Sequence, residues 1–269
     1  MRGASAKSQQ EAVAAVEDAL GHQADAASLG DELFGVVDLL DVEPSLRRIL
    51  TDPAATQDAK AELVRLLFAD KVSDPTAAVL TAAASGRWSR GRDLADALEL
   101  AGATALLVGA ESQGQLDEVE DELFRFGRVA HGNSELRGVL SDPAIPRERR
   151  RALAGALLEG RSTPWTVSLV SQALVARRRS FEATLTEFGE VAAQRRAQLV
   201  ASVRAPYELD PQERQRLADA LERTYGQPVH LNVLVDPAVL GGLSVEVGDE
   251  IIDATMSGRL EDARRRIAG

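Results

Sequence analysis

Apolar residues recur at helical spacing along most of the chain, and the stretch from Arg90 to Glu111 carries them on more than one face. Its two apolar stripes consist of Leu94, Leu98, Ala101, Ala105 and Val108, and of Leu100, Ala103 and Leu107. A helix that is apolar on more than one face has to be covered from more than one side. The pattern therefore predicts a central helix that is packed between two groups of helices.

The chain before this central helix and the chain after it repeat the same sequence ninety residues apart. Asp31-Glu32-Leu33-Phe34 returns as Asp121-Glu122-Leu123-Phe124, and Asp52-Pro53-Ala54 returns as Asp142-Pro143-Ala144. The register holds without a gap, which indicates an internal duplication. We therefore expect two tandem six-helix-type bundles that share the central helix, with a duplicated N-terminal bundle over residues 1–96 and a second bundle over residues 97–197.

The pattern changes at Leu199, where apolar and polar residues begin to alternate as they do in a strand. Asp210-Pro211-Gln212-Glu213 is a helix-capping signature and opens a helix that reaches about Tyr225. Further strands are expected over 229–235, 243–247 and 250–253, followed by a basic last helix. The predicted fold class is mainly α, with a small C-terminal α+β sandwich over residues 198–269.

Composition limits the classes of function. The 269 residues include 42 acidic and 31 basic side chains, and a net charge of −11 argues against a nucleic-acid-binding surface. No apolar run is long enough to insert into a membrane, and the opening MRGASAKSQQEAV lacks the apolar middle of a signal peptide. With no cysteine, thiolate metal sites are excluded as well. The expected address is the cytoplasm.

The candidate catalytic and metal-binding residues do not form a convincing site. The three histidines, His22, His131 and His230, lie far apart in the sequence, and none has the partners of a catalytic triad nearby. The carboxylates from Asp249 to Asp253 offer fewer oxygen ligands than a calcium loop needs. We therefore expect no catalytic residues, no cofactor and no metal, although a hydrolase or metal enzyme that uses these carboxylates stays open as an alternative.

Small residues form a lane on the central helix, where Gly102, Ala105 and Gly109 recur at steps of three and four residues. Glycine costs roughly 1 kcal/mol relative to alanine within a helix, so two glycines on one face suggest that another helix packs there closely. The alternative is packing within the bundle itself. A similar lane precedes it by ninety residues, and the residues that complete the two lanes lie on the fifth helix of each bundle. The first lane is completed by Ser168 and Ser171, and the second comprises Ala12, Ala15, Ala19, Ala78 and Thr81.

The C-terminal stretch LNVLVDPAVLGGLSVEVGDEIIDATMSGRLEDARRRI resembles the signature of the delta subunit of F-type ATP synthases, the bacterial counterpart of the oligomycin sensitivity conferral protein. The residues that carry the resemblance include the signature turns at Gly241, Gly242, Gly248 and Asp253. Ala254 and Thr255 stand where the family usually has Gly-Ser. The resemblance extends back to about Leu98, and the segment before it resembles the duplicated bundle of actinobacterial members.

The resemblance implies a non-catalytic subunit of the peripheral stalk, or stator, which resists rotor torque during proton-driven ATP synthesis. The implied partners are the α subunits of the catalytic head, bound by the helical domain, and the b subunits of the stalk, bound by the C-terminal domain. The implied location is the cytoplasmic face of the cell membrane, peripheral, without direct membrane insertion. The lane of Gly102, Ala105 and Gly109, with Ser168 and Ser171, is then expected to hold a helix of an α subunit. The other lane would be a second groove, and an adaptor protein unrelated to ATP synthase is the alternative function.

Overall fold

The computed structural model describes residues 3–142, 144–175, 180–196, 199–226, 228–236, 239, 242–247 and 250–253. The chain divides into two compact units, one ending at Ala193 and the other beginning at Gln194. The first unit is helical and the second is built on a small β-sheet, so the predicted class, mainly α with a small α+β domain, is confirmed.

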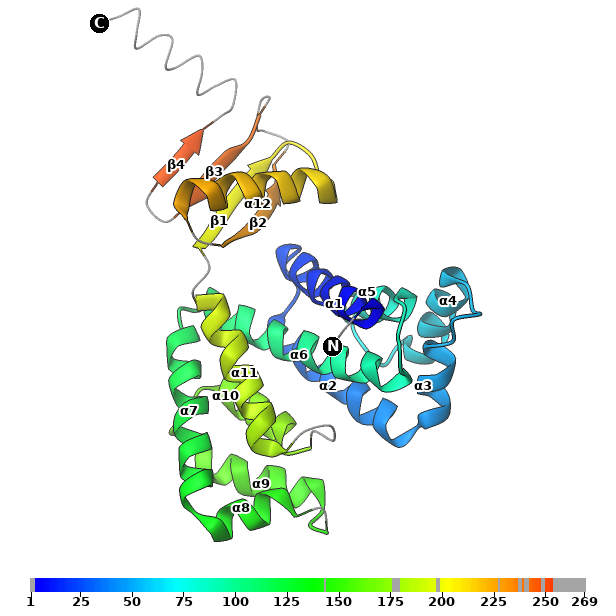
Figure 1. The fold of residues 1–269 in the computed structure, drawn as a ribbon, viewed down its shortest axis with the longest axis vertical. Coiled ribbons are helices and arrows are strands. Elements are labelled where there is room, and N and C mark those ends of the chain that lie inside the picture. Colours follow the sequence, from blue (N-terminus) through cyan, green and yellow to red (C-terminus); the bar gives the residue numbers. More distant parts are fainter. Residues whose placement is uncertain are drawn as a thin grey trace, which may run out of the picture. The chain divides into compact units, whose positions relative to one another are not determined.

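The helical part of the chain contains the helices α1 to α11 (Figure 1). Side chains fix several of their starts: Asp25 accepts a hydrogen bond from the Ser28 N–H at 2.7 Å, and Pro164 occupies the first turn of α10, where a missing N–H costs nothing. The bounds are α1 Ala4–Gly21, α2 Ala26–Val42, α3 Pro44–Leu50, α4 Gln57–Phe68, α5 Asp74–Ser85, α6 Gly91–Ser112, α7 Leu116–Gly132, α8 Ser134–Ser141, α9 Arg147–Leu158, α10 Pro164–Ala173 and α11 Phe181–Arg196.

Helix α6 is the predicted central helix, and it runs through the middle of the helical unit (Figure 1). Leu94 and Leu98 belong to an apolar core that is otherwise built from α1 to α5. Leu106 and Leu107, three turns further on, belong to a second core that extends over α7 to α11. The two apolar stripes therefore serve two cores, which is why this helix is apolar on more than one face.

The helices on the two sides of α6 share their lengths and spacing. Helices α2 and α7 have 17 residues each, and helices α4 and α9 have 12 residues each. Ala26–Val42 is followed ninety residues later by Leu116–Gly132, and Gln57–Phe68 is followed at the same distance by Arg147–Leu158. The sequence repeat is thus accompanied by a repeat of the helix boundaries.

A hydrogen-bond network around a glutamate occurs twice at the same spacing, partly buried at Glu32 and buried at Glu122. The Glu32 carboxylate accepts hydrogen bonds from the Ser73 N–H at 2.9 Å, from the Ser73 hydroxyl at 2.8 Å and from the Thr76 hydroxyl at 2.5 Å. Burial by itself raises the pKa of Glu32, but the donors on Thr76 and Ser73 outweigh it, so the net pKa lies below the usual value. Each network ties the start of a fifth helix to a second helix. The matching contacts ninety residues later are made by Glu122, Thr163 and Thr166.

The C-terminal unit contains a four-stranded sheet among the residues described, in the order β2-β1-β3-β4. Strands β1 and β2 are parallel, whereas β3 pairs antiparallel with both β1 and β4. Helix α12 lies between β1 and β2 in sequence and makes the crossover that a parallel pair requires. The bounds are β1 Leu199–Ala205, α12 Pro211–Tyr225, β2 Val229–Val235, β3 Ser244–Val247 and β4 Glu250–Asp253.

Most of the predicted C-terminal elements are confirmed. Asp210 caps α12 as expected, with its side chain accepting from the Glu213 N–H and the Glu213 side chain accepting from the Asp210 N–H. Leu221 from this helix joins Val203 and Val245 in a core on one face of the sheet. The predicted basic last helix lies outside the described residues.

Candidate partner-binding surfaces

The small-residue lane of Gly102, Ala105 and Gly109 lies on α6 and is buried. A Cβ added to Gly102 would lie 2.7 Å from the Phe34 ring, and one added to Gly109 would lie 2.5 Å from the Trp165 ring. Phe34 belongs to α2 and Trp165 to α10, so these three positions are covered by the chain's own helices. Packing within the bundle, the alternative explanation, accounts for these small residues, and the expectation of an open lane there has to be corrected.

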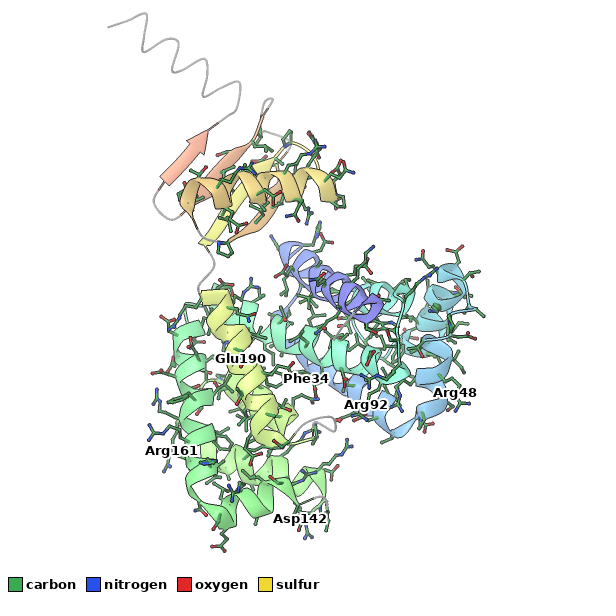
Figure 2. The ribbon with its side chains drawn as sticks, in the orientation of Figure 1. Phe34, Arg48, Arg92, Asp142, Arg161 and Glu190 are labelled. Carbon is green, nitrogen blue, oxygen red and sulfur yellow. The ribbon has the colours of Figure 1, made fainter. Side chains whose placement is uncertain are left out.

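Helix α2 is also held in place beside α6 by ionic contacts. The Asp38 carboxylate forms ion pairs with Arg147 and Arg151 of α9, each with a nitrogen-to-oxygen distance of 3.0 Å. A Cβ added to Gly30 would lie 2.7 Å from the Leu106 side chain, so the backbone of α2 also approaches α6 closely. The helices before and after α6 are therefore joined by close packing and by charge. Figure 2 shows Phe34 at this junction.

Ser168 and Ser171, the other two residues of the predicted α-subunit groove, lie on α10 and are half-buried. The Ser171 carbonyl accepts a hydrogen bond from Arg151 Nε at 3.3 Å. Unlike the lane on α6, this part of the predicted groove is still reached by solvent. Of the predicted α-subunit groove, the accessible part is therefore on α10.

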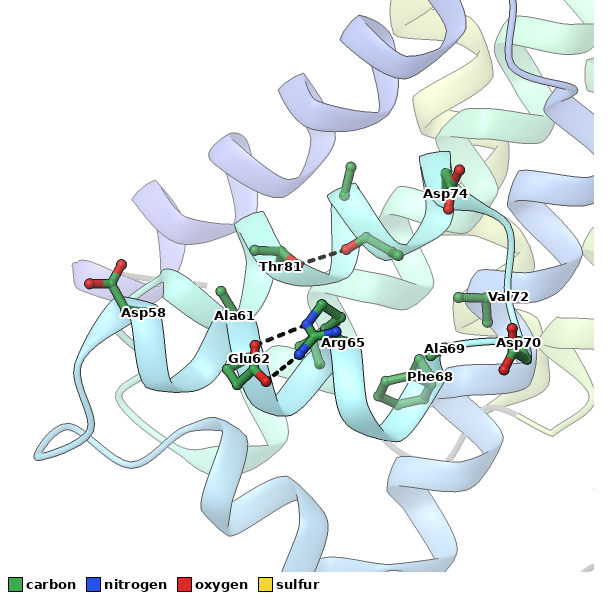
Figure 3. Close-up of a pocket in the computed structure, with 13 residues that line it drawn as sticks. Asp58, Ala61, Glu62, Arg65, Phe68, Ala69, Asp70, Val72, Asp74 and Thr81 are labelled. Carbon is green, nitrogen blue, oxygen red and sulfur yellow. Dashed lines mark hydrogen bonds and ion pairs between the residues drawn. The ribbon is translucent and has the colours of Figure 1, made fainter.

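The residues of the predicted second groove lie in two different places. Ala12 is fully buried, and Ala15 and Ala19 pack half-buried against the first core. Ala78 and Thr81 instead line a surface groove of about 560 Å³ between α4 and α5 (Figure 3). The structure thus brings Ala78 and Thr81 together on one groove, and Ala12, Ala15 and Ala19 are not among its lining residues.

Two of the four signature turn positions can be described. Gly242 has a φ of +119°, a backbone conformation that side-chain-bearing residues rarely adopt, so glycine is required there. Asp253 is the last residue of β4. Gly241 and Gly248 lie outside the described residues. The signature therefore includes a turn residue between β2 and β3 and the end of the edge strand.

Glu99 is a half-buried carboxylate on α6 whose Oε1 accepts a hydrogen bond from Gln172 Nε2 at 2.7 Å. Burial raises the pKa of Glu99 against the opposing hydrogen bond from Gln172, and with the nearby carboxylates of Asp96, Glu187 and Asp41 the net pKa is about 7. The side chain connects the shared helix to α10. Its charge therefore changes near neutral pH at the junction of the two groups of helices.

An open groove between α7 and α11 is absent from the sequence-based interpretation. It is lined by Phe124 and Gly127 on α7 and by Thr186 and Gly189 on α11, among others. Phe124 is 65% exposed. The sequence feature that indicates this groove is a pair of glycines, Gly127 and Gly132, within an amphipathic helical stretch. A bundle core does not need glycines at these positions.

In the part of the chain that the structure describes, few residues are candidates for a catalytic or metal-binding site. No group of three or more histidine, aspartate or glutamate side chains is placed there to hold a metal ion. Asp249, one of the carboxylates weighed for a cation, lies outside the described residues, as does the imidazole of His230. The helices described include none that is long and apolar enough to cross a membrane.

Comparison with known proteins gives two consistent findings. The family model described as "ATP synthase delta (OSCP) subunit" matches residues 102–267. That range covers α6 from the middle of its length, α7 to α11 and the C-terminal unit. The helices α1 to α5 lie outside it.

Curated relatives match over nearly the full length of the chain. ATP synthase subunit delta of Beutenbergia cavernae is 49% identical over 91% of this chain and 90% of the relative. The subunit of the same name from Streptomyces avermitilis is 46% identical over 96% of this chain and 97% of the relative. That of Thermobifida fusca is 44% identical over the whole of both chains. The match to the Thermobifida fusca subunit therefore includes the segment of α1 to α5, which the family model leaves out.

Proposed function

This chain belongs to the ATP synthase delta (OSCP) subunit family, which forms the peripheral stalk of F-type ATP synthases, and we propose that it links the α subunits of the head to the b subunits of the stalk. The observation that carries the proposal is the full-length similarity to three subunits of that name. The role is mechanical, since the stalk has to resist the torque of the rotor, and the chain is not itself an enzyme. It acts at the cytoplasmic face of the membrane as a peripheral component.

We further propose a three-part organisation in which residues 1–96 are a duplicate of the bundle at 97–197 and residues 198–269 hold the b subunits. The repeated helix boundaries and the paired networks at Glu32 and Glu122 support the duplication. The shared helix α6 and the ion pairs of Asp38 support the joining of the two proposed bundles within one compact helical unit. Such joined bundles would transmit force through packed helices.

The function is tested by reconstitution on membranes of the same organism that have been stripped of this subunit. We expect the full-length protein to restore the attachment of the catalytic head and ATP-driven proton pumping. Both are measured on the same vesicles, by membrane-bound ATP hydrolysis and by quenching of a pH-sensitive dye. If head attachment and pumping are the same with and without the added protein, the chain is an adaptor of another kind and the proposal fails.

The contact with an α subunit is proposed at the accessible surface of α10 around Ser168 and Ser171. We expect Ser168→Trp and Ser171→Trp to weaken binding to the stripped head by about tenfold, the equivalent of roughly 1.4 kcal/mol. The reason is that a large ring blocks the approach of another helix to α10. Ser141→Trp, at the exposed end of α8, is the matched control. Unchanged affinity in both α10 variants, measured by calorimetry with the circular dichroism still helical, would rule out this surface.

A further inference from the structure

The groove between α7 and α11 has the form of a binding site for a helix. Its volume is about 830 Å³. On each helix the lining residues recur at steps of three and four, which places them on one face. The lining face of α7 includes Phe124, Gly127, Arg128 and His131, and that of α11 includes Glu182, Leu185, Thr186, Gly189, Glu190 and Ala193.

The equivalent face ninety residues earlier shows what such a surface accommodates. Phe34 on α2 stands where Phe124 stands on α7, yet Phe34 is 6% exposed and Phe124 is 65% exposed. Phe34 is covered because it packs on Gly102 of α6, within the lane of small residues described above. Phe34 is therefore covered by α6 in one half of the helical unit, whereas in the other half α11, which follows α6 by ninety residues, leaves Phe124 exposed.

Among the residues that the structure describes, none packs against the glycines of the open groove. A Cβ added to Gly127, Gly132 or Gly189 would meet no atom within 4 Å, whereas one added to Gly30 or Gly102 would clash. Glycine inside a helix costs roughly 1 kcal/mol relative to alanine. Three glycines that nothing inside the described chain explains leave a surface flat enough for another helix to approach closely.

The charge on the groove specifies the charge of its occupant. The carboxylates of Glu120, Asp121, Glu182 and Glu190 line it, together with the guanidinium of Arg128, which lies over the Phe124 ring at 5.9 Å. Asp121 is paired with Arg125 at 3.4 Å, so the acidic character of the rim comes mainly from the other three carboxylates. Figure 2 labels Glu190 on α11. An apolar groove with an acidic rim is complementary to an amphipathic helix whose polar side carries lysine and arginine.

We propose that the groove between α7 and α11 binds a basic amphipathic helix of another subunit of the same complex. Its apolar face packs on the exposed ring of Phe124, and small residues on that face allow it to approach Gly127 and Gly189, as the α6 lane does with α2. This contact is separate from the α10 surface proposed above. It depends on the proposed function only for the identity of the complex.

The first test compares charge and apolar variants of the full-length protein in binding to membranes stripped of this subunit. We expect Phe124→Asp and Glu190→Lys each to weaken binding by about tenfold or more, and the binding of the unmodified protein to weaken as salt is added. The matched controls are Leu66→Asp, which alters another apolar side chain that is 66% exposed, and Glu135→Lys on α8. Glu190 is exposed, so its variant tests the groove even if Phe124→Asp impairs folding. Binding equal to the controls in Glu190→Lys would overturn the proposal.

The second test identifies the occupant, and the absence of cysteine from the sequence makes it specific. Thr186→Cys places a single thiol in the groove for a benzophenone crosslinker, and Leu66→Cys places one on α4 as the control. In the reassembled complex, we expect Thr186→Cys to crosslink to a helical segment of another subunit with net positive charge, and the control not to do so. A crosslink to an acidic segment, to another copy of this chain or to its own residues 194–269, or none at all, would each contradict the proposal. Head attachment is measured separately in the reconstitution. A failure of the expected crosslink therefore leaves the proposed function intact.

Discussion

Gly102→Leu is expected to lower the free energy of unfolding of the helical unit by about 3 kcal/mol or more, since overpacking of a tight core costs a few kcal/mol. Even a single Cβ at this position would come within 2.7 Å of the Phe34 ring and 3.2 Å of the Gly30 carbonyl oxygen, and a leucine side chain needs far more space. Neither the buried ring nor the backbone of α2 can move away without opening the junction between the two cores. We expect the variant to unfold at a lower midpoint concentration of denaturant, measured by circular dichroism.

The control for this prediction is Gly35→Leu in α2. Gly35 is exposed and a Cβ there would meet nothing within 4 Å, so the substitution should be neutral or stabilise the protein by about 0.5–1 kcal/mol through helix propensity. If the two variants unfold at the same denaturant concentration, helix α2 does not pack on α6 as described. The pair also separates stability from binding, because a destabilised Gly102 variant loses affinity for indirect reasons.

The local pattern of the sequence was sufficient to predict most of the secondary structure. The central helix, the capping of α12 by Asp210 and the strands Val229–Val235 and Glu250–Asp253 all appear where periodicity and turn residues placed them. These features depend on neighbours a few residues away, which a single sequence contains. Where the elements meet depends instead on contacts between distant parts of the chain.

The lane on α6 illustrates this limit. Gly102, Ala105 and Gly109 predict that a helix packs closely, but spacing along one helix does not say which helix that is. The occupant is α2, which is joined to the chain beyond α6 by Asp38 and its two arginines, more than one hundred positions away. Such an ion pair leaves no periodic signal in the sequence, so spacing alone does not distinguish a helix of this chain from a helix of another subunit.

Phe34 and Phe124 are a second case in which the local sequence does not predict the packing. They occupy equivalent places in a repeated sequence, and their local patterns predict equal burial. Their exposed fractions of 6% and 65% differ because Phe34 packs on Gly102 of α6 and belongs to a core, whereas Phe124 belongs to neither core of the helical unit. A repeated helical unit that cannot cover its last face on its own is typical of tandem architectures, in which the terminal surface is either capped or used for binding.

The second large effect on stability is expected at Glu99, and its size depends on pH. The folded-state pKa is about 7, above the ordinary value of 4.5, because burial and the neighbouring carboxylates disfavour the charged form. As the pH rises, the unfolded chain therefore loses this proton before the folded chain does. The free energy of unfolding falls between pH 4.5 and about 7 and is level with respect to this group above that range.

Glu99→Gln removes the charge and keeps a side chain that can form a hydrogen bond with Gln172, whose Oε1 is a buried acceptor without a hydrogen-bond partner among the described residues. At pH 8 we expect the variant to be more stable than the unmodified protein by roughly 2–3 kcal/mol, at about 1.4 kcal/mol per pKa unit and reduced for partial exposure to solvent. At pH 4.5, where the folded chain keeps the proton and the unfolded chain keeps it in about half of the molecules, the difference should be small. Urea denaturation at the two pH values measures it. A stability difference that is the same at both values would mean that Glu99 titrates as an ordinary surface carboxylate, and that the junction between α6 and α10 carries no strain from its charge at neutral pH.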